Sequence, residues 1–232
     1  MKNKNNYNQK VLNFSFKNNY LYKDIFKNSC NEIAIEIIEK WPDWPSDNRI
    51  TCIYGPSGSG KTHLTNIWMQ KTKAIIYNEI NHLSLEYIYS IKKPVIFENL
   101  SNNNKWPEDI LFEFINEVRS SGNYLLITCS KNPLKLNWKL KDIISRFSSF
   151  TNIEIKLPND DLIKKVLIKC FADRQLSLDK QYIDYISMRI ERSYLAINKI
   201  VDIIDTLTLQ YKRPINYSLV KEAIIISDNN KS

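Results

Sequence analysis

One stretch decides the fold of this chain, Gly55-Pro56-Ser57-Gly58-Ser59-Gly60-Lys61-Thr62. It matches the pattern G-x-x-x-x-G-K-[ST] of a phosphate-binding loop. Residues 49–54 before it predict a short strand, and residues 63–70 after it predict a helix, which is the context that this loop requires. The alternative is a glycine- and serine-rich turn with a surface lysine, which the flanking strand and helix disfavour. The stretch therefore predicts a nucleotide-binding domain.

The residue types of the loop explain how it would hold phosphate. Glycines let backbone N–H groups point at phosphate oxygens, and the helix that begins near Gly60 adds the positive end of its dipole. Lys61 can neutralise the β- and γ-phosphates, and the Thr62 hydroxyl can coordinate Mg²⁺. We expect all eight loop residues, and His63 directly after them, to contact the nucleotide.

Apolar runs alternate with helical segments after the loop. The runs at 74–78, 94–98, 124–129 and 153–157 predict strands, and the segments 83–91, 107–121 and 140–147 predict helices. Continuously apolar strands are typical of a parallel sheet that is covered on both faces. Beyond Pro158 the strand signals stop, and the segments 160–172, 180–190, 193–212 and 218–226 predict helices. We expect an α/β fold with a five-stranded parallel sheet over residues 25–157, a polar tail over 1–24 and a small all-helical lid domain over 158–232.

Composition narrows the class of protein. The chain has 232 residues, is 43% hydrophobic and has a formal net charge of +8. It lacks an apolar run of membrane-spanning length and an N-terminal signal peptide, so a cytoplasmic protein is expected. The four cysteines show no C-x-x-C spacing, which favours buried free thiols over a metal site or disulfides. Because the lysines are dispersed, direct DNA binding is expected to be weak or absent.

Two residues at the end of the third expected strand, Glu98 and Asn99, suggest how the site would treat ATP. Phosphate-loop ATPases carry an acid there that holds Mg²⁺ through water, and many carry a second acid that positions the attacking water. Glu98 is longer than the usual aspartate, and Asn99 cannot act as a general base. The pair predicts slow hydrolysis by the protein alone.

Three further polar residues have a functional and a structural interpretation each. Ser130, just past the 124–129 strand, could face the γ-phosphate or simply form a turn. Arg146 lies between apolar neighbours, where it could reach a nucleotide on an adjacent subunit as an arginine finger or form an ion pair on its own domain. Arg192 starts a helix of the second domain, from which it could fold back on the nucleotide.

The segments before the loop also leave alternatives open. In the tail, Gln9, Leu12 and Phe14 could form a short peptide that docks into a pocket of another protein, although their spacing alone favours packing on their own domain. A capping-box pattern at 29–32 predicts a helix start. The turn Trp41-Pro42-Asp43-Trp44-Pro45 follows that helix, and it could pack beside the base or form a hydrophobic plug.

Together these motifs resemble the AAA+ ATPase family, and within it the clade of the bacterial replication initiator DnaA. More narrowly they resemble the Hda family of regulatory inactivators of DnaA, in its alphaproteobacterial form. The residues that carry the resemblance span nearly the whole chain: Gln9-x-x-Leu12-x-Phe14, residues 41–45, Gly55 to Leu64 with Ile67-Trp68, Glu98-Asn99, Ser145-Arg146-Phe147 and Glu191-Arg192-Ser193. The phosphate loop alone is unspecific, whereas the 41–45 turn followed by Gly60-Lys61-Thr62-His63-Leu64 is much more specific.

The resemblance implies roles for several of these residues. Gln9, Leu12 and Phe14 would contact the DNA polymerase III sliding clamp (β subunit). Arg146 would be the finger that triggers ATP hydrolysis on DnaA, Arg192 the second sensor and Ser130 the first. The sequence departs from the family pattern at two places, since Glu98-Asn99 replaces a pair of aspartates and Ser130 stands where the initiator commonly has aspartate.

The expected function is therefore negative control of replication initiation. The protein would bind ADP or ATP with Mg²⁺, dock on the DNA-loaded clamp and stimulate ATP hydrolysis by DnaA; a homodimer is compatible with this role. The alternative is an AAA+ ATPase like a helicase loader, which acts on DNA or on the replicative helicase. A small-molecule phosphotransferase is disfavoured because the sequence lacks substrate-site signals and has a helical lid.

Overall fold

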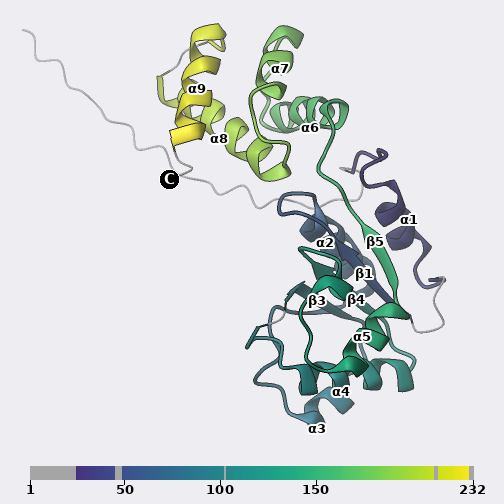
Figure 1. The fold of residues 1–232 in the computed structure, drawn as a ribbon. Coiled ribbons are helices and arrows are strands. Elements are labelled where there is room, and N and C mark those ends of the chain that lie inside the picture. Colours follow the sequence, from purple (N-terminus) through teal and green to yellow (C-terminus); the bar gives the residue numbers. More distant parts are fainter. Residues whose placement is uncertain (1–24, 45–48, 102, 212–213, 230–232) are drawn as a thin grey trace, which may run out of the picture. The chain divides into compact units, whose positions relative to one another are not determined.

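The computed structural model describes residues 25–44, 49–101, 103–211 and 214–229 (Figure 1). The described chain forms two compact units: one contains the residues from Ile25 to Ile163 together with Arg192–Leu195, and the other contains Lys164–Glu191 and the residues from Ala196 onward. The expected tail over 1–24, with Gln9, Leu12 and Phe14, lies outside the described residues. The domain limits expected from the sequence stay a prediction.

The first unit is an α/β unit with one parallel sheet. Its elements are α1 (Glu32–Lys40), β1 (Ile50–Tyr54), α2 (Lys61–Thr72), β2 (Ile75–Tyr77), α3 (Leu85–Ser90), β3 (Val95–Leu100), α4 (Glu108–Ser120), β4 (Leu125–Cys129), the short 3₁₀ helix η2 (Pro133–Lys135), α5 (Lys141–Ser148) and β5 (Thr151–Glu154). Among the described residues the sheet has five strands in the order β2-β3-β4-β1-β5, and every neighbouring pair is parallel. The five-stranded parallel sheet predicted from the sequence is confirmed.

Helices cover both faces of the sheet (Figure 1). On one face α1 and α2 pack against alternate strand residues such as Ile53 and Leu126. On the other face α3, α4 and α5 pack against Cys52, Phe97 and Ile127. The alternation explains the apolar strand runs, because both faces of each central strand are buried. The phosphate loop leaves the carboxyl end of β1, with β4 and β5 beside it.

The fifth strand differs from its prediction. The sequence predicted residues 153–157, whereas β5 is Thr151–Glu154. Its ladder with β1 runs from Thr51 to Tyr54, where β1 gives way to the phosphate loop. Ile155 is buried beyond the strand, while Leu157 is 39% exposed. The apolar run therefore extends past the last β1 residue with which a strand could pair.

The segment before β1 settles two predictions. Helix α1 begins at Glu32, so the helix start that the 29–32 pattern predicts is confirmed, but the capping box itself does not form. Asn31 makes no side-chain cap, and the Ser29 hydroxyl donates to Asn28 Oδ1. The tryptophan turn is a hydrophobic plug. The Trp44 ring stacks on the buried Trp68 ring of α2 with centroids 5.3 Å apart, and its Nε1–H donates to the Ile37 carbonyl at 2.8 Å.

The second unit is helical, as predicted. Its helices are α6 (Asp160–Asp173, which begins in the α/β unit), α7 (Lys180–Ser187), α8 (Tyr194–Tyr211, whose first residues also belong to the α/β unit) and α9 (Tyr217–Asn229). Buried apolar residues such as Phe171, Ile183, Ile200 and Val220 form its interior. Arg174 is mostly covered and pairs with Asp202 on α8.

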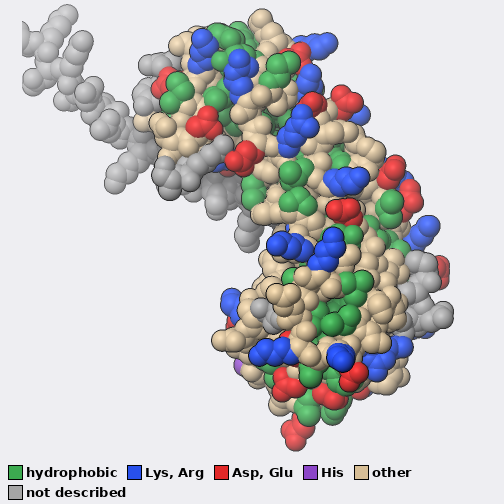
Figure 2. All heavy atoms as spheres, viewed as in Figure 1, with side chains coloured by type: hydrophobic (Ala, Val, Ile, Leu, Met, Phe, Trp, Pro, Cys, Tyr) green, Lys and Arg blue, Asp and Glu red, His purple; other side chains and the backbone are tan. Residues whose placement is uncertain are grey.

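Charge is spread over the visible surface. Figure 2 shows lysine and arginine side chains scattered among acidic ones on both units, rather than gathered in one stripe. Every helix in the described ranges is too short or too polar to cross a bilayer.

Candidate nucleotide-binding site

The phosphate loop joins β1 to α2. Gly60, the residue before α2, has φ of +100°, in the left-handed region that glycine adopts without a steric cost. No side chain caps the first turn of α2. The first backbone N–H groups of a helix have no partner within the helix, so an anion is a natural acceptor for them. The local geometry fits a phosphate group.

Lys61 places its ammonium inside this loop. Its side chain is buried, and Nζ donates to the carbonyl oxygens of Gly55 at 2.7 Å and Pro56 at 2.8 Å. Burial lowers the pKa of Lys61, and the nearby Cys129 and Glu98 partly oppose this effect. The hydrogen-bond partners of this buried cation are neutral carbonyls. A phosphate would supply the negative charge that a buried cation requires.

Thr62 and Glu98 meet at the mouth of the loop. The Thr62 hydroxyl donates to Glu98 Oε1 at 2.6 Å, so the fold brings the start of α2 and the end of β3 together. Mg²⁺ in nucleotide sites is bound by one or two carboxylate or hydroxyl oxygens together with phosphates and waters. The two side chains therefore fit a magnesium ion that a nucleotide carries.

Asn99 occupies a local irregularity of β3. Its φ is +58°, and the register between β3 and β4 shifts between Phe97 and Leu100. The backbone N–H of Asn99 donates to the hydroxyl of Thr128 at 2.9 Å, and Thr128 is buried in β4. The bulge leaves the Asn99 side chain exposed directly after Glu98. Sequence reasoning missed Thr128, although it is the only hydroxyl residue within the 124–129 run besides Tyr124.

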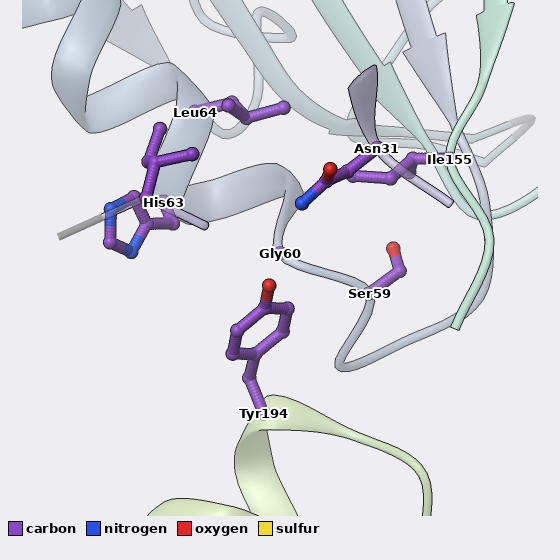
Figure 3. A pocket seen from close by; sticks show the side chains of 8 residues that line it. Asn31, Ser59, Gly60, His63, Leu64, Ile155 and Tyr194 are labelled. Carbon is purple, nitrogen blue, oxygen red and sulfur yellow. The ribbon is translucent and has the colours of Figure 1, made fainter. Parts of the chain in front are cut away.

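A pocket adjoins the loop on the side of α1. It is lined by Ile25, Asn31, Ser59, Gly60, His63, Leu64, Ile155 and Tyr194 (Figure 3). The buried Ser59 hydroxyl has no hydrogen-bond partner in the part of the chain that the structure describes, so a ligand could satisfy it. The sequence predicted Ser59, Gly60 and His63 as ligand contacts, and the pocket brings them together. Asn31 and Tyr194 were missed, because they come from distant segments.

The remaining predicted residues lie around this centre. Ser130 is exposed just beyond β4, which lies between the strands that carry the loop and Glu98. Arg192 is also exposed, and its Nη2 lies 3.0 Å from Asp160 Oδ1 rather than in contact with the loop. Exposed Pro56 and Ser57 form the outer part of the loop.

Arg146 lies on α5, and its side chain contacts Phe112 rather than the phosphate loop. Phe147, the next residue, is buried and stacks on Trp138 with ring centroids 5.4 Å apart. The Glu108 carboxylate accepts the N–H groups of the residues before α5. The half-buried Arg146 guanidinium lies 5.6 Å from the centre of the Phe112 ring, and within the described residues it forms no ion pair. The structure does not support the ion pair that was the alternative for this residue.

Comparison with known proteins finds similarity to the replication initiator DnaA. No protein-family model matches the chain. An uncharacterised protein of Haemophilus influenzae is 25% identical over 185 residues, which cover 74% of this chain and 80% of that protein. The initiator DnaA of Bacteroides thetaiotaomicron is 20% identical over 230 residues, which cover 89% of this chain and 49% of DnaA. The chain thus spans about half the length of this DnaA relative.

Solved structures agree on the fold. Domain III of Thermotoga maritima DnaA superposes with a TM-score of 0.73 at 16% identity, covering 90% of this chain and 96% of that domain. This is an AAA+ fold. The structure of AMPPCP-bound DnaA from Aquifex aeolicus matches with a TM-score of 0.65 at 18% identity, covering 90% of this chain and 81% of that one. The chain is therefore similar in sequence to DnaA and in fold to domain III of the Thermotoga protein.

Proposed function

We propose that this protein is a negative regulator of chromosomal replication initiation, which holds a nucleotide and stimulates ATP hydrolysis by DnaA in trans. The similarity to DnaA supports a place in replication. An arginine supplied in trans can stabilise charge on the nucleotide of a neighbouring molecule during phosphoryl transfer. The finger of this protein is Arg146. Its target is the nucleotide of a DnaA molecule that lies against α5.

The state of Arg146 is the observation that carries the proposal. The Arg146 guanidinium is packed on the Phe112 ring, and within the described residues no acidic side chain pairs with it. An aromatic ring orients the planar group and leaves its N–H fork available to an incoming phosphate. Helix α5 is held in place by the buried Phe147 side chain and by the Glu108 carboxylate, which accepts the Leu140 N–H at the start of the helix. The arginine is therefore pre-organised for a charge supplied by another molecule.

The protein's own nucleotide site would act as a structural element. ADP or ATP would be held by Lys61 and the loop N–H groups, with Mg²⁺ beside Thr62 and Glu98. The ion would screen the charge of the phosphates. Asn99 cannot take a proton from water, so the site retains nucleotide rather than turning it over. Ser130 would face the terminal phosphate.

Docking on the sliding clamp would bring the regulator to replicating DNA. This part of the proposal rests on Gln9, Leu12 and Phe14, whose pattern resembles the clamp-binding peptide of the Hda family. Clamp and finger would then act together on DnaA, and the conversion of initiator-ATP to initiator-ADP would prevent re-initiation.

The test is ATP hydrolysis by DnaA, measured with and without DNA-loaded clamp and this protein. The wild-type protein should stimulate ATP hydrolysis by DnaA only when loaded clamp is present. Arg146→Ala should lower the stimulated rate of hydrolysis by about 10³-fold or more, or to the rate of DnaA alone. Arg146→Lys should fail nearly as badly, since an ammonium cannot reproduce the planar fork. Arg189→Ala is the matched control, because Arg189 also lies over an aromatic ring, that of Tyr185, but in the helical unit.

Full stimulation by Arg146→Ala at equal clamp loading would refute the finger. Brisk ATP hydrolysis by the protein alone, independent of the clamp, would instead favour the alternative of an ATPase like a helicase loader. The face shown in Figure 2 offers that alternative little support, because its basic residues are dispersed among acidic ones.

A further inference from the structure

The short segment Arg192–Leu195, here called the strap, approaches the phosphate loop through Ser193 and Tyr194. The Tyr194 backbone N–H donates to the Gly58 carbonyl at 2.9 Å. Gly58 has φ of +74°, and a Cβ on it would lie 2.6 Å from Cβ of the buried Ser193. The strap can approach this closely only because residue 58 is glycine.

The Tyr194 side chain extends this contact into the pocket. A Cβ on Gly60 would lie 3.1 Å from Tyr194 Cε2, and the tyrosine lines the same pocket as Ser59 and His63 (Figure 3). The strap therefore borders both the loop that would hold phosphate and the pocket beside it. A shift of Tyr194 would therefore change the lining of this pocket.

The cation of the strap already has an anionic partner. Arg192 Nη2 lies 3.0 Å from Oδ1 and 3.2 Å from Oδ2 of Asp160, the first residue of α6. Both side chains are well exposed, at 60% and 59%. An exposed pair of this kind is weak and is easily exchanged for a stronger anion. A nucleotide phosphate carries more charge than a carboxylate and could replace it.

We propose that Asp160 is a positioning residue that competes with nucleotide phosphate for the Arg192 guanidinium and so weakens nucleotide binding. The inference rests on the proposed function, which assigns the nucleotide to this loop. The Asp160 carboxylate pairs with the Arg192 guanidinium at the start of α6. A nucleotide phosphate bound at the loop attracts the same guanidinium, so the two anions compete for it. The affinity for nucleotide is therefore lower than it would be without Asp160. Weaker binding favours the exchange of one bound nucleotide for another.

The test is titration of the full-length protein with ADP in the presence of Mg²⁺. Asp160→Asn should bind ADP about two- to fivefold more tightly, the range expected from loss of one exposed ion pair. Asp161→Asn is the matched control, since it removes the same charge from the neighbouring exposed position in the first turn of α6. Arg192→Ala should weaken binding, and Asp160→Asn should add nothing in that background.

The double variant separates competition for Arg192 from a general charge effect. An equal gain from Asp161→Asn, or a gain that persists without Arg192, would overturn the competition. Unchanged ADP affinity in Asp160→Asn, with normal binding by the wild-type protein, would overturn this inference alone. Failure of the wild-type protein to bind ADP would overturn the proposed nucleotide site and this inference with it.

Discussion

Replacing Asn99 with aspartate should speed up ATP hydrolysis by this protein, which we predict to be slow. The Asn99 side chain is exposed directly after Glu98, whose carboxylate accepts the Thr62 hydroxyl. Aspartate has nearly the shape of asparagine, and both residues tolerate the positive φ found here. The hydrogen bond to Thr128 uses the backbone N–H, so the substitution leaves it intact. The change therefore adds a base without disturbing the bulge.

The size of the effect follows from the chemistry of the added group. A positioned general base contributes about 10²- to 10⁴-fold to a rate. The new carboxylate would stand next to Glu98, and like charges at close range raise the pKa of one partner, which makes it a stronger base for water as long as it stays ionised at neutral pH. Glu98, however, is longer than the aspartate usual at its position, which works against an ideal geometry. We therefore expect a gain at the lower end, about 10²-fold.

The assay is single-turnover hydrolysis of ATP by the purified protein with Mg²⁺, in the absence of DnaA and clamp. ATP and ADP affinities measured in parallel would show that binding is retained. Asn103→Asp is the control, because Asn103 is exposed in the loop after β3 and its substitution adds the same charge. A change of less than about twofold in Asn99→Asp with intact binding, or an equal gain in Asn103→Asp, would refute the assignment of Asn99 to the position of the base.

Three further outcomes are expected. Lys61→Ala should abolish binding of ADP in a titration, because the loop loses its buried cation; unchanged affinity would refute the phosphate site. Glu108→Ala should lower the free energy of unfolding in urea by about 1–2 kcal/mol and reduce DnaA stimulation, since two backbone N–H groups before α5 lose their acceptor; an unaffected stimulation would show that the Glu108 contact is not needed to position the finger. Replacing Gln9, Leu12 and Phe14 together with alanine should remove clamp binding in a pull-down and leave ADP affinity unchanged; clamp retention by this variant would argue that the tail packs on its own domain.

Local patterns explain most of what could be predicted. The phosphate loop is a contiguous stretch whose glycines and lysine act within a few residues, so its position and its following helix were predictable. The central strands were recognisable because burial on both faces leaves an uninterrupted apolar run, as in 124–129. Such signals depend on neighbouring residues, and the chain carries them without any knowledge of its tertiary contacts.

Predictions that depended on distant partners were less accurate. The limits of β5 were wrong by about two residues because its end depends on where β1 stops. The role of Thr128 was missed because its hydroxyl serves the backbone of Asn99 on the next strand. No periodicity in either segment records this contact, which arises only when β3 and β4 lie side by side.

The sequence by itself determined the α/β class, the order of the elements and the residues of the phosphate loop, because these follow from burial and from contiguous backbone chemistry. Only the tertiary structure decided which side chains meet. It joined Thr62 to Glu98 across 36 positions of sequence, paired Arg192 with Asp160, and left Arg146 on an aromatic ring without an acidic partner in the described residues. Charges attract whichever opposite charge the fold brings within a few ångströms, and that choice is made by packing rather than by sequence spacing.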